Sequence, residues 1–193
     1  KRGDIGTSVT AYAEAWLTPG SPLESDAMTV AAYQGVGSLA DAMVLGESAG
    51  KGLFVLAATS NPEAAAVQQA LVQSGPRANQ SVARAIIEDV HSFNQEQSGP
   101  RPFGSVGLVL GATVDLADYG IDVATAGERT PALPVLAPGF GHQGARVEDA
   151  ARLFGSLAPG VIVSESRGLL GAGPTGLADA VARRAEEVRA AHV

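Results

Sequence analysis

The chain has 193 residues, with 24 glycines, 11 prolines, no cysteine and a formal net charge of -7. Its 46% apolar and 17% charged residues make it too hydrophobic for a disordered chain, while no apolar run approaches the roughly 20 residues that span a bilayer. The acidic balance excludes a basic surface for nucleic acid, and the absence of cysteine excludes disulfides and thiolate metal ligands. We therefore expect one soluble domain with no nucleic-acid or membrane partner, and the lack of cysteine is compatible with a reducing cytoplasm.

Short apolar runs alternate with amphipathic segments along the chain, which is typical of βα units with a parallel sheet. The apolar runs predict strands at residues 27–32, 53–58, 105–110, 134–137 and 161–163. Each run is nearly uniformly apolar, so we expect strands that are buried on both faces. Apolar residues spaced three and four apart predict helices at residues 39–49, 64–72, 82–93, 116–126, 147–157 and 177–190.

The series of units closes on a strand and a helix, as an eight-stranded TIM barrel does. Such a barrel usually needs about 250 residues, which leaves two or three strands unaccounted for on the N-terminal side. The sequence also starts at Lys1 without an initiator Met, and we expect an internal cut there. The alternative, an open doubly wound sheet, would suit about 190 residues, but no G-x-G-x-x-G motif follows an early strand. We therefore favour an α/β fold of the TIM (β/α)8 barrel type, N-terminally incomplete, with residues 1–193 forming a single barrel domain.

Polar residues follow the last two predicted strands, at the end of a barrel where function collects. The segments that carry these polar residues are Pro138-Gly139-Phe140-Gly141-His142-Gln143-Gly144 and Ser164-Glu165-Ser166-Arg167-Gly168. The glycines let the backbone approach an anion, Gln143 adds donors, and the planar guanidinium of Arg167 can bind two phosphate oxygens. A glycine-rich turn alone is equally typical of an ordinary tight loop, but together with Arg167 on the adjacent strand end it predicts a phosphate site.

Lys1 and Asp4 form the other candidate pair, three residues apart and directly after an expected strand. A lysine and an aspartate at this spacing can form an ion pair beside a reacting centre. Most pairs with this spacing are instead exposed salt bridges that contribute little to stability. The spacing alone therefore favours the structural interpretation.

The segment Lys1-Arg2-Gly3-Asp4-Ile5-Gly6 resembles the latter part of the D-x-K-x-x-D-I signature of orotidine 5'-phosphate decarboxylases, in the A-K-R-G-D-I-G form of a bacterial branch. Further stretches resemble the same branch in the same order, and the similarity covers essentially the whole chain. These stretches are Leu56-Ala57-Ala58-Thr59-Ser60-Asn61-Pro62-Glu63, Gly111-Ala112-Thr113, Pro138-Gly139-Phe140-Gly141-His142-Gln143-Gly144 and Ser166-Arg167.

The resemblance implies a TIM barrel enzyme without cofactor or metal that converts orotidine 5'-monophosphate to UMP and carbon dioxide, the last step of de novo UMP synthesis. It makes Lys1 the proton donor to the pyrimidine carbon that loses the carboxylate. It makes Asp4 a carboxylate that reaches into the partner's site in a homodimer, with a helix over residues 9–16 in the interface. By the same resemblance the substrate-binding residues are Ser8 near the sugar and phosphate, Ser60 at the pyrimidine, and Pro138, Gly139, Gln143, Ser166 and Arg167 around the phosphate.

The sequence departs from the family at several points. The first Asp of the signature would stand two positions before Lys1, and the family's other active-site Asp and Lys belong on earlier strands; none of them is in this sequence. His142 replaces a small apolar residue of this branch, and we expect it to face solvent. Arg183-Arg184 and Glu186-Glu187 predict a solvated helix face.

Two other functions are compatible with the sequence. A Schiff-base aldolase would use Lys1 as its nucleophile, although Asp4 favours the ammonium form over the free amine that this chemistry needs. A binding module for a phosphate ligand would hold UMP tightly without turning over orotidine 5'-monophosphate.

Overall fold

The computed structural model describes residues 6–97 and 101–191, so the predictions for Lys1 and Asp4 lie outside the described residues. Five parallel strands form one sheet in the order β1-β2-β3-β4-β5. Each strand agrees with a predicted one to within a residue at either end. They are β1 (Ala27–Ala31), β2 (Gly52–Ala58), β3 (Val106–Leu110), β4 (Val135–Pro138) and β5 (Val161–Ser164).

The α-helices of the described residues differ widely in length. They are α1 (Gly6–Leu17), α2 (Ala40–Ser48), α3 (Ala65–Gln68), α4 (Val82–Glu96), α5 (Ala150–Phe154), α6 (Arg167–Leu170) and α7 (Gly173–Ala190). Short 3-10 helices lie between them: η1 (Val36–Leu39), η2 (Pro62–Ala64), η3 (Leu116–Tyr119), η4 (Gly141–Gln143), η5 (Val147–Asp149) and η6 (Gly155–Gly160). No helix within the described ranges is long and apolar enough to cross a membrane.

Three of the predicted helices are wrong in extent. The segment 64–72 holds only the single turn of α3, because Leu71 then pairs with Ser81 in an isolated antiparallel bridge. The segment 116–126 holds only η3, which ends at Gly120 in the left-handed conformation with φ 69°. The segment 147–157 is broken into η5, α5 and η6, because Gly155 turns the chain against the carbonyl oxygen of Val123.

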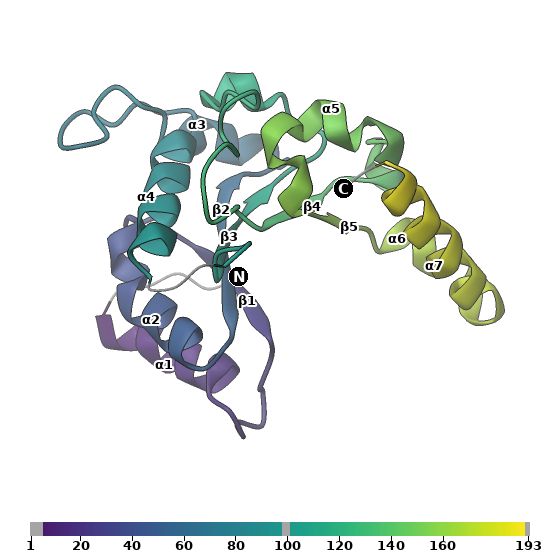
Figure 1. The fold of residues 1–193 in the computed structure, drawn as a ribbon, viewed down its shortest axis with the longest axis horizontal. Coiled ribbons are helices and arrows are strands. Elements are labelled where there is room, and N and C mark those ends of the chain that lie inside the picture. Colours follow the sequence, from purple (N-terminus) through teal and green to yellow (C-terminus); the bar gives the residue numbers. More distant parts are fainter. Residues whose placement is uncertain (1–5, 98–100, 192–193) are drawn as a thin grey trace.

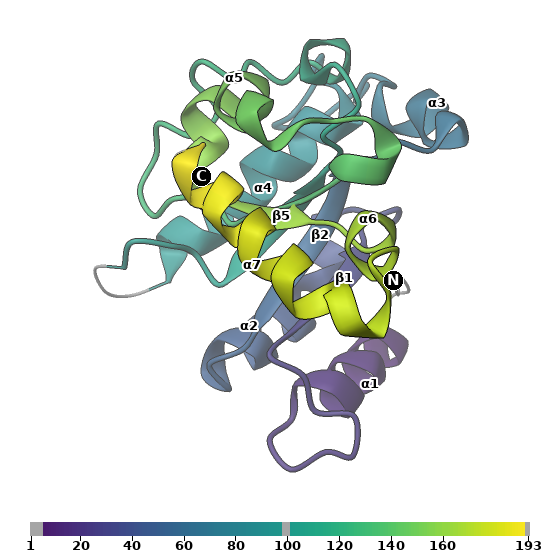
Figure 2. The ribbon, with the colours of Figure 1, turned by 90° about the vertical axis from the view of Figure 1, so that its right-hand side faces the viewer.

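The sequential strand order decides between the two candidate α/β folds. A doubly wound sheet reverses its strand order at a switch point, whereas a barrel adds each strand beside the one before it. Here every strand pairs with its neighbour in sequence, and Figure 1 shows the sheet bending while the helices follow it around the outside. Figure 2 shows α6 and α7 leading away from β5 at the C-terminal end of this curve. The fold is therefore that of an incomplete TIM barrel.

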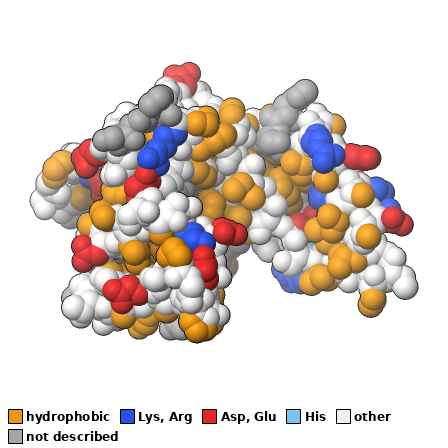
Figure 3. All heavy atoms as spheres, turned by 60° about the horizontal axis from the view of Figure 1, so that its bottom comes forward, with side chains coloured by type: hydrophobic (Ala, Val, Ile, Leu, Met, Phe, Trp, Pro, Cys, Tyr) orange, Lys and Arg blue, Asp and Glu red, His pale blue; other side chains and the backbone are white. Residues whose placement is uncertain are grey.

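The prediction that the strands are buried on both faces is confirmed for β3 and wrong for the others. All of β3 is buried, but buried and half-exposed residues alternate along β1, β2 and β4, and Ile162 of β5 is 47% exposed. The buried residues of β2, such as Leu53 and Val55, belong to the core cluster shared with α1, α2 and α4. The other face lines the hollow that Figure 3 shows between the two ends of the molecule. In a closed barrel, strands on the opposite side would cover this face.

The parallel arrangement brings the carboxyl ends of the strands to one edge of the sheet. Pro138 of β4 pairs in register with Ser164 of β5. The loop after β4 approaches the end of β3 so closely that a Cβ atom on Gly139 would lie 3.3 Å from the backbone nitrogen of Ala112. The loops after β4 and β5, which carry Gln143 and Arg167, are thus neighbours, as the sequence order implies.

Candidate active site

A cavity of about 200 Å³ lies at the carboxyl ends of β4 and β5. Residues of both strand ends line it, and four of the predicted substrate-binding residues are among them. The lining residues are Pro138, Phe140, His142, Gln143, Ser164, Glu165, Ser166 and Arg167. Gly139, also predicted, is buried at the start of the loop that carries Gln143 and does not line the cavity.

The loop after β4 is a tight turn that presents Gln143. Gly139, Gly141 and Gly144 have φ values of 123°, 65° and 107°, which residues with a side chain adopt only with strain. The backbone nitrogen of Gly141 donates to the carbonyl of Ala145 at 2.9 Å, and that of Ala145 donates to Gly139 at 3.1 Å. The glycine spacing therefore closes the loop on itself, and Gln143 is exposed at its tip.

Arg167 begins α6 directly after β5, and its side chain is exposed at the cavity. Within the described residues, neither its guanidinium nor the amide of Gln143 forms a hydrogen bond or ion pair with another side chain. Both groups are thus donors without an acceptor in the described part of the chain, on two loops that meet at one cavity. This arrangement suits an anion with several oxygens, such as a phosphate. His142 lines the same cavity and is exposed, which confirms the prediction that it faces solvent.

Glu165 is the charged residue of the cavity lining whose side chain is buried, at 4% exposed. Nε of Arg184 lies 2.7 Å from its Oε2 as a close ion pair outside hydrogen-bond geometry, and Nη2 of Arg184 donates to Oε1 at 3.4 Å. The prediction of a solvated face for residues 183–187 is therefore wrong for Arg184, which α7 turns inward; Arg183, Glu186 and Glu187 are exposed.

The end of β2 is fixed by a separate set of hydrogen bonds around Thr59, which is 8% exposed. Its backbone nitrogen donates to Oε1 of Gln68 at 2.9 Å, and its hydroxyl donates to Oδ1 of Asn61 at 2.8 Å. Tyr119, from η3, donates to the Thr59 carbonyl at 3.5 Å. Ser60 follows directly, is exposed, and lies beside Gly111 at the end of β3.

The remaining predicted residues are not brought to this cavity. Ser60 stands at the end of β2, two strands from β4, and does not line it. Ser8 is exposed on α1, and Figure 1 shows α1 and α6 at opposite ends of the curved sheet. Within one chain the structure therefore joins Pro138, Gln143, Ser166 and Arg167 and leaves Ser8 and Ser60 apart from them.

A larger cavity, of about 690 Å³, lies between the segment 112–123 and α5. The cation in its lining is Arg152, and this side chain already pairs with Asp149 at 3.3 Å. Asp115 and Asp122 add negative charge. The smaller cavity is therefore the better candidate for an anionic ligand, because its Arg167 has no ion pair within residues 6–97 and 101–191.

The fold and the cavity define a parallel α/β barrel protein with a cavity between the loops at the ends of β4 and β5. Residues 1–178 match the family described as "Orotidine 5'-phosphate decarboxylase / HUMPS family", and the chain belongs to this family.

Curated relatives and solved structures agree with this assignment. The chain is 47% identical over 174 residues to the orotidine 5'-phosphate decarboxylase of Salinispora tropica, covering 90% of this chain and 58% of the relative. It is 44% identical over 194 residues to that of Streptomyces coelicolor, covering 99% of this chain and 64% of the relative. A crystal structure of a Streptomyces avermitilis protein named as an orotidine 5'-phosphate decarboxylase has a TM-score of 0.86 at 44% identity, covering 100% of this chain and 63% of that one. The structure of Leishmania donovani OMP decarboxylase has a TM-score of 0.72 at 29% identity, covering 100% and 66%. The chain thus spans about six tenths of the length of these curated relatives.

Proposed function

We propose that the full-length protein converts orotidine 5'-monophosphate to UMP and carbon dioxide in de novo pyrimidine synthesis. Two facts support this: membership of the family, and the cavity at the ends of β4 and β5. The observation that carries most weight is that the guanidinium of Arg167 and the amide of Gln143 line one cavity from neighbouring loops. Neither group has a side-chain partner among the residues that the structure describes. Phosphate would bind there, with Ser166 and Pro138 shaping the wall.

The chemistry we propose follows from the charge that develops on the substrate. The bond between the pyrimidine ring and its carboxylate breaks, carbon dioxide leaves, and the electron pair stays on the ring carbon. The ammonium of Lys1 would stabilise this carbanion and then deliver a proton to it. Asp4 would keep Lys1 charged and would disfavour the substrate carboxylate more than the product. No electron pair has to pass to a cofactor, so the proposed step uses protein side chains alone.

Binding of the phosphate would contribute to this step although it lies away from the reacting carbon. Interactions with a remote part of a substrate can be used to order loops and exclude water around the reacting atoms. We propose that Ser60 hydrogen-bonds the pyrimidine at the end of β2 while Gln143 and Arg167 hold the phosphate. The substrate would then lie across the carboxyl edge of the sheet.

We further propose a cytoplasmic homodimer in which Asp4 and Ser8 of one subunit complete the site of the other. The separation of Ser8 from the phosphate cavity within one chain supports this arrangement. It can be tested by mixing an inactive Lys1→Ala full-length protein with an inactive Asp4→Ala one. Subunit exchange should restore activity, because one site of each heterodimer joins an intact Lys1 to an intact Asp4. No recovery despite demonstrated exchange would place Asp4 in its own chain's site.

The proposed reaction is tested by following the release of labelled carbon dioxide from carboxyl-labelled orotidine 5'-monophosphate by the full-length protein. Lys1→Ala should abolish release while sparing UMP binding, because Lys1 acts at the reacting carbon. Retention of more than a few per cent of kcat would contradict its role as proton donor. Tight binding of UMP by the wild-type protein without any turnover would instead identify a nucleotide-binding module.

A further inference from the structure

We propose that Glu165 and Arg184 form a positioning pair behind the phosphate cavity. In this arrangement Glu165 joins the loop after β4 to α6, and Arg184 cancels the negative charge that Glu165 would otherwise present to the ligand. The inference rests on the proposed function, since it concerns how the cavity accepts a phosphate group. Neither residue is assigned such a role by the sequence motifs.

The first observation is the place of the Glu165 carboxylate between two backbones. A Cβ atom on Gly141 would lie 2.0 Å from Oε1 of Glu165, and one on Gly168 would lie at the same distance. Gly141 belongs to the loop that carries Gln143, and Gly168 follows Arg167. The carboxylate therefore packs directly against both segments that present the proposed phosphate ligands.

The second observation is that Arg184 supplies the compensating charge from a distant element. It reaches from α7 to both carboxylate oxygens, with contacts of 2.7 Å to Oε2 and 3.4 Å to Oε1, and its side chain is 27% exposed. Arg184 also pairs with Glu187 on the same helix. By contrast Arg167, two residues after Glu165, has no protein partner among the described residues. Arg184 thus pairs with the buried carboxylate of Glu165, while Arg167 lines the open cavity.

The electrostatic consequence follows from burial. A carboxylate that is 4% exposed and lines the cavity would repel a phosphate dianion if it were unpaired, with little water to screen it. Removing one member of a buried pair leaves an uncompensated charge, whereas removing both charges together can be nearly neutral. Loss of Arg184 alone should therefore harm phosphate binding more than loss of the whole pair.

The experiment measures the dissociation constants of UMP and uridine by calorimetry with the full-length protein. Arg184→Met, which keeps the apolar stem, should weaken UMP binding on the order of tenfold and change uridine binding by less than about twofold. Adding Glu165→Gln to this variant should recover most of the loss. Arg183→Met is the matched control, because Arg183 is exposed on the same helix, and it should bind UMP like the wild type.

Each other outcome overturns the inference. Equal losses for UMP and uridine would mean that the pair only supports the fold, and a double variant as weak as Arg184→Met would exclude the Glu165 charge as the cause. If Arg184→Met does not fold, Arg184→Lys replaces it. Because this variant keeps the positive charge, its dissociation constant for UMP should stay within about threefold of the wild type. A larger loss that affects UMP but not uridine would contradict the idea that the charge of Arg184 neutralises Glu165. A folded wild-type protein that binds no UMP would refute the proposed function itself, whereas UMP binding that ignores Arg184 would refute only this inference.

Discussion

Thr59 and Gln68 hold each other through reciprocal hydrogen bonds. The backbone nitrogen of Thr59 donates to Oε1 of Gln68 at 2.9 Å, and Nε2 of Gln68 donates to the hydroxyl of Thr59 at 3.0 Å. The single turn of α3 is thereby fastened to the end of β2. Ser60 follows Thr59, so the pair also fixes the backbone that presents the proposed pyrimidine contact.

Gln68→Ala should therefore lower the free energy of unfolding by about 1–3 kcal/mol, because it removes one partner from the nearly buried donor and hydroxyl of Thr59. Gln69→Ala is the matched control, since Gln69 is exposed and its change should stay within about 0.5 kcal/mol. Urea denaturation of the two variants measures both values. Equal stability of the two variants would show that solvent replaces Gln68 without cost.

Arg167→Ala should weaken UMP binding by about 1.5–3 kcal/mol, the range of one charge-assisted hydrogen-bonding contact. Uridine, which lacks the phosphate, should bind the variant and the wild type alike. Arg183→Ala removes an exposed arginine elsewhere and should leave both ligands unaffected. Calorimetric titration measures the dissociation constants of both ligands. Equal losses of affinity for UMP and uridine would place Arg167 away from the phosphate.

The strands and the loop pair were predictable from the sequence because each depends on neighbouring residues. An apolar run bounded by turns identifies β4, and chain order alone puts Gln143 and Arg167 on adjacent loops. The pair of Thr59 and Gln68 was not predictable, because the helix expected over residues 64–72 is a single turn that redirects Gln68. The pair of Glu165 and Arg184 was not predictable either, because the periodicity of α7 does not tell which of its side chains reaches the residue after β5. Side-chain pairing between elements depends on their packing, which a sequence pattern leaves open.

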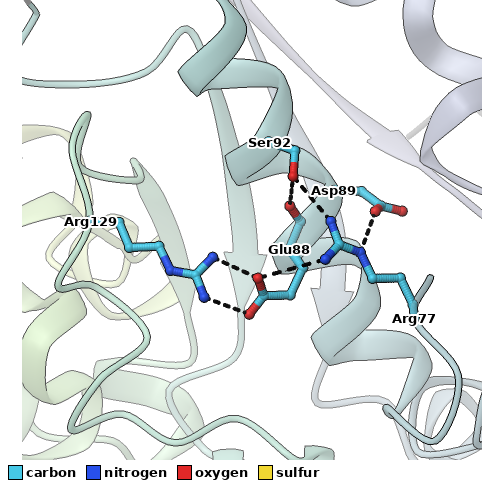
Figure 4. A network of polar contacts seen from close by, with 5 residues as sticks. All are labelled: Arg77, Glu88, Asp89, Ser92 and Arg129. Carbon is cyan, nitrogen blue, oxygen red and sulfur yellow. Dashed lines mark hydrogen bonds and ion pairs between the residues drawn. The ribbon is translucent and has the colours of Figure 1, made fainter.

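A network of charged side chains joins the segment before β4 to α4, away from the proposed site (Figure 4). Arg129 binds both carboxylate oxygens of Glu88, at 2.6 and 3.0 Å, while Arg77 lies 3.9 Å from Glu88 and 2.8 Å from Asp89. Burial opposes ionisation of Glu88, but the hydrogen bonds and charge of Arg129, with the charges of Arg77 and Arg84, outweigh it and hold its pKa below the usual 4.5. Glu88 is thus more acidic in the folded than in the unfolded chain.

Glu88→Gln should lower the free energy of unfolding at neutral pH by about 1 kcal/mol, a modest value because solvent screens the half-exposed arginines. A lowered carboxyl pKa stabilises the fold above pH 4.5, and this contribution is lost as the pH falls through the folded value. The wild type should therefore lose its advantage over the variant below pH 4.5. Glu128→Gln, at an exposed neighbour of Arg129, is the control. Denaturation curves at pH 7 and below pH 4.5 would contradict this account if the difference persisted in acid.

His91 should make the stability of the protein depend on pH in a higher range. The side chain lies on α4, is 1% exposed, and neither ring nitrogen has a hydrogen-bond partner among the described residues. Burial lowers its pKa below the usual 6.5, the charge of Arg129 lowers it further, and Glu88 offsets only part of this. The folded chain therefore keeps His91 neutral at pH values where the unfolded chain binds a proton.

The sign of the effect follows from this difference in proton binding. The contribution of neutral His91 to the free energy of unfolding is fully present above pH 6.5. It is lost as the pH drops from 6.5 toward the pKa of His91 in the folded chain, because the unfolded state binds a proton that the folded state does not bind. His91→Leu removes the titrating group and both unpartnered nitrogens, so its free energy of unfolding should change less between pH 7.5 and 5.5 than that of the wild type. His142→Leu, at an exposed histidine, should keep the wild-type dependence. An unchanged slope in His91→Leu would mean that His91 is protonated in the folded protein and that another group carries the dependence.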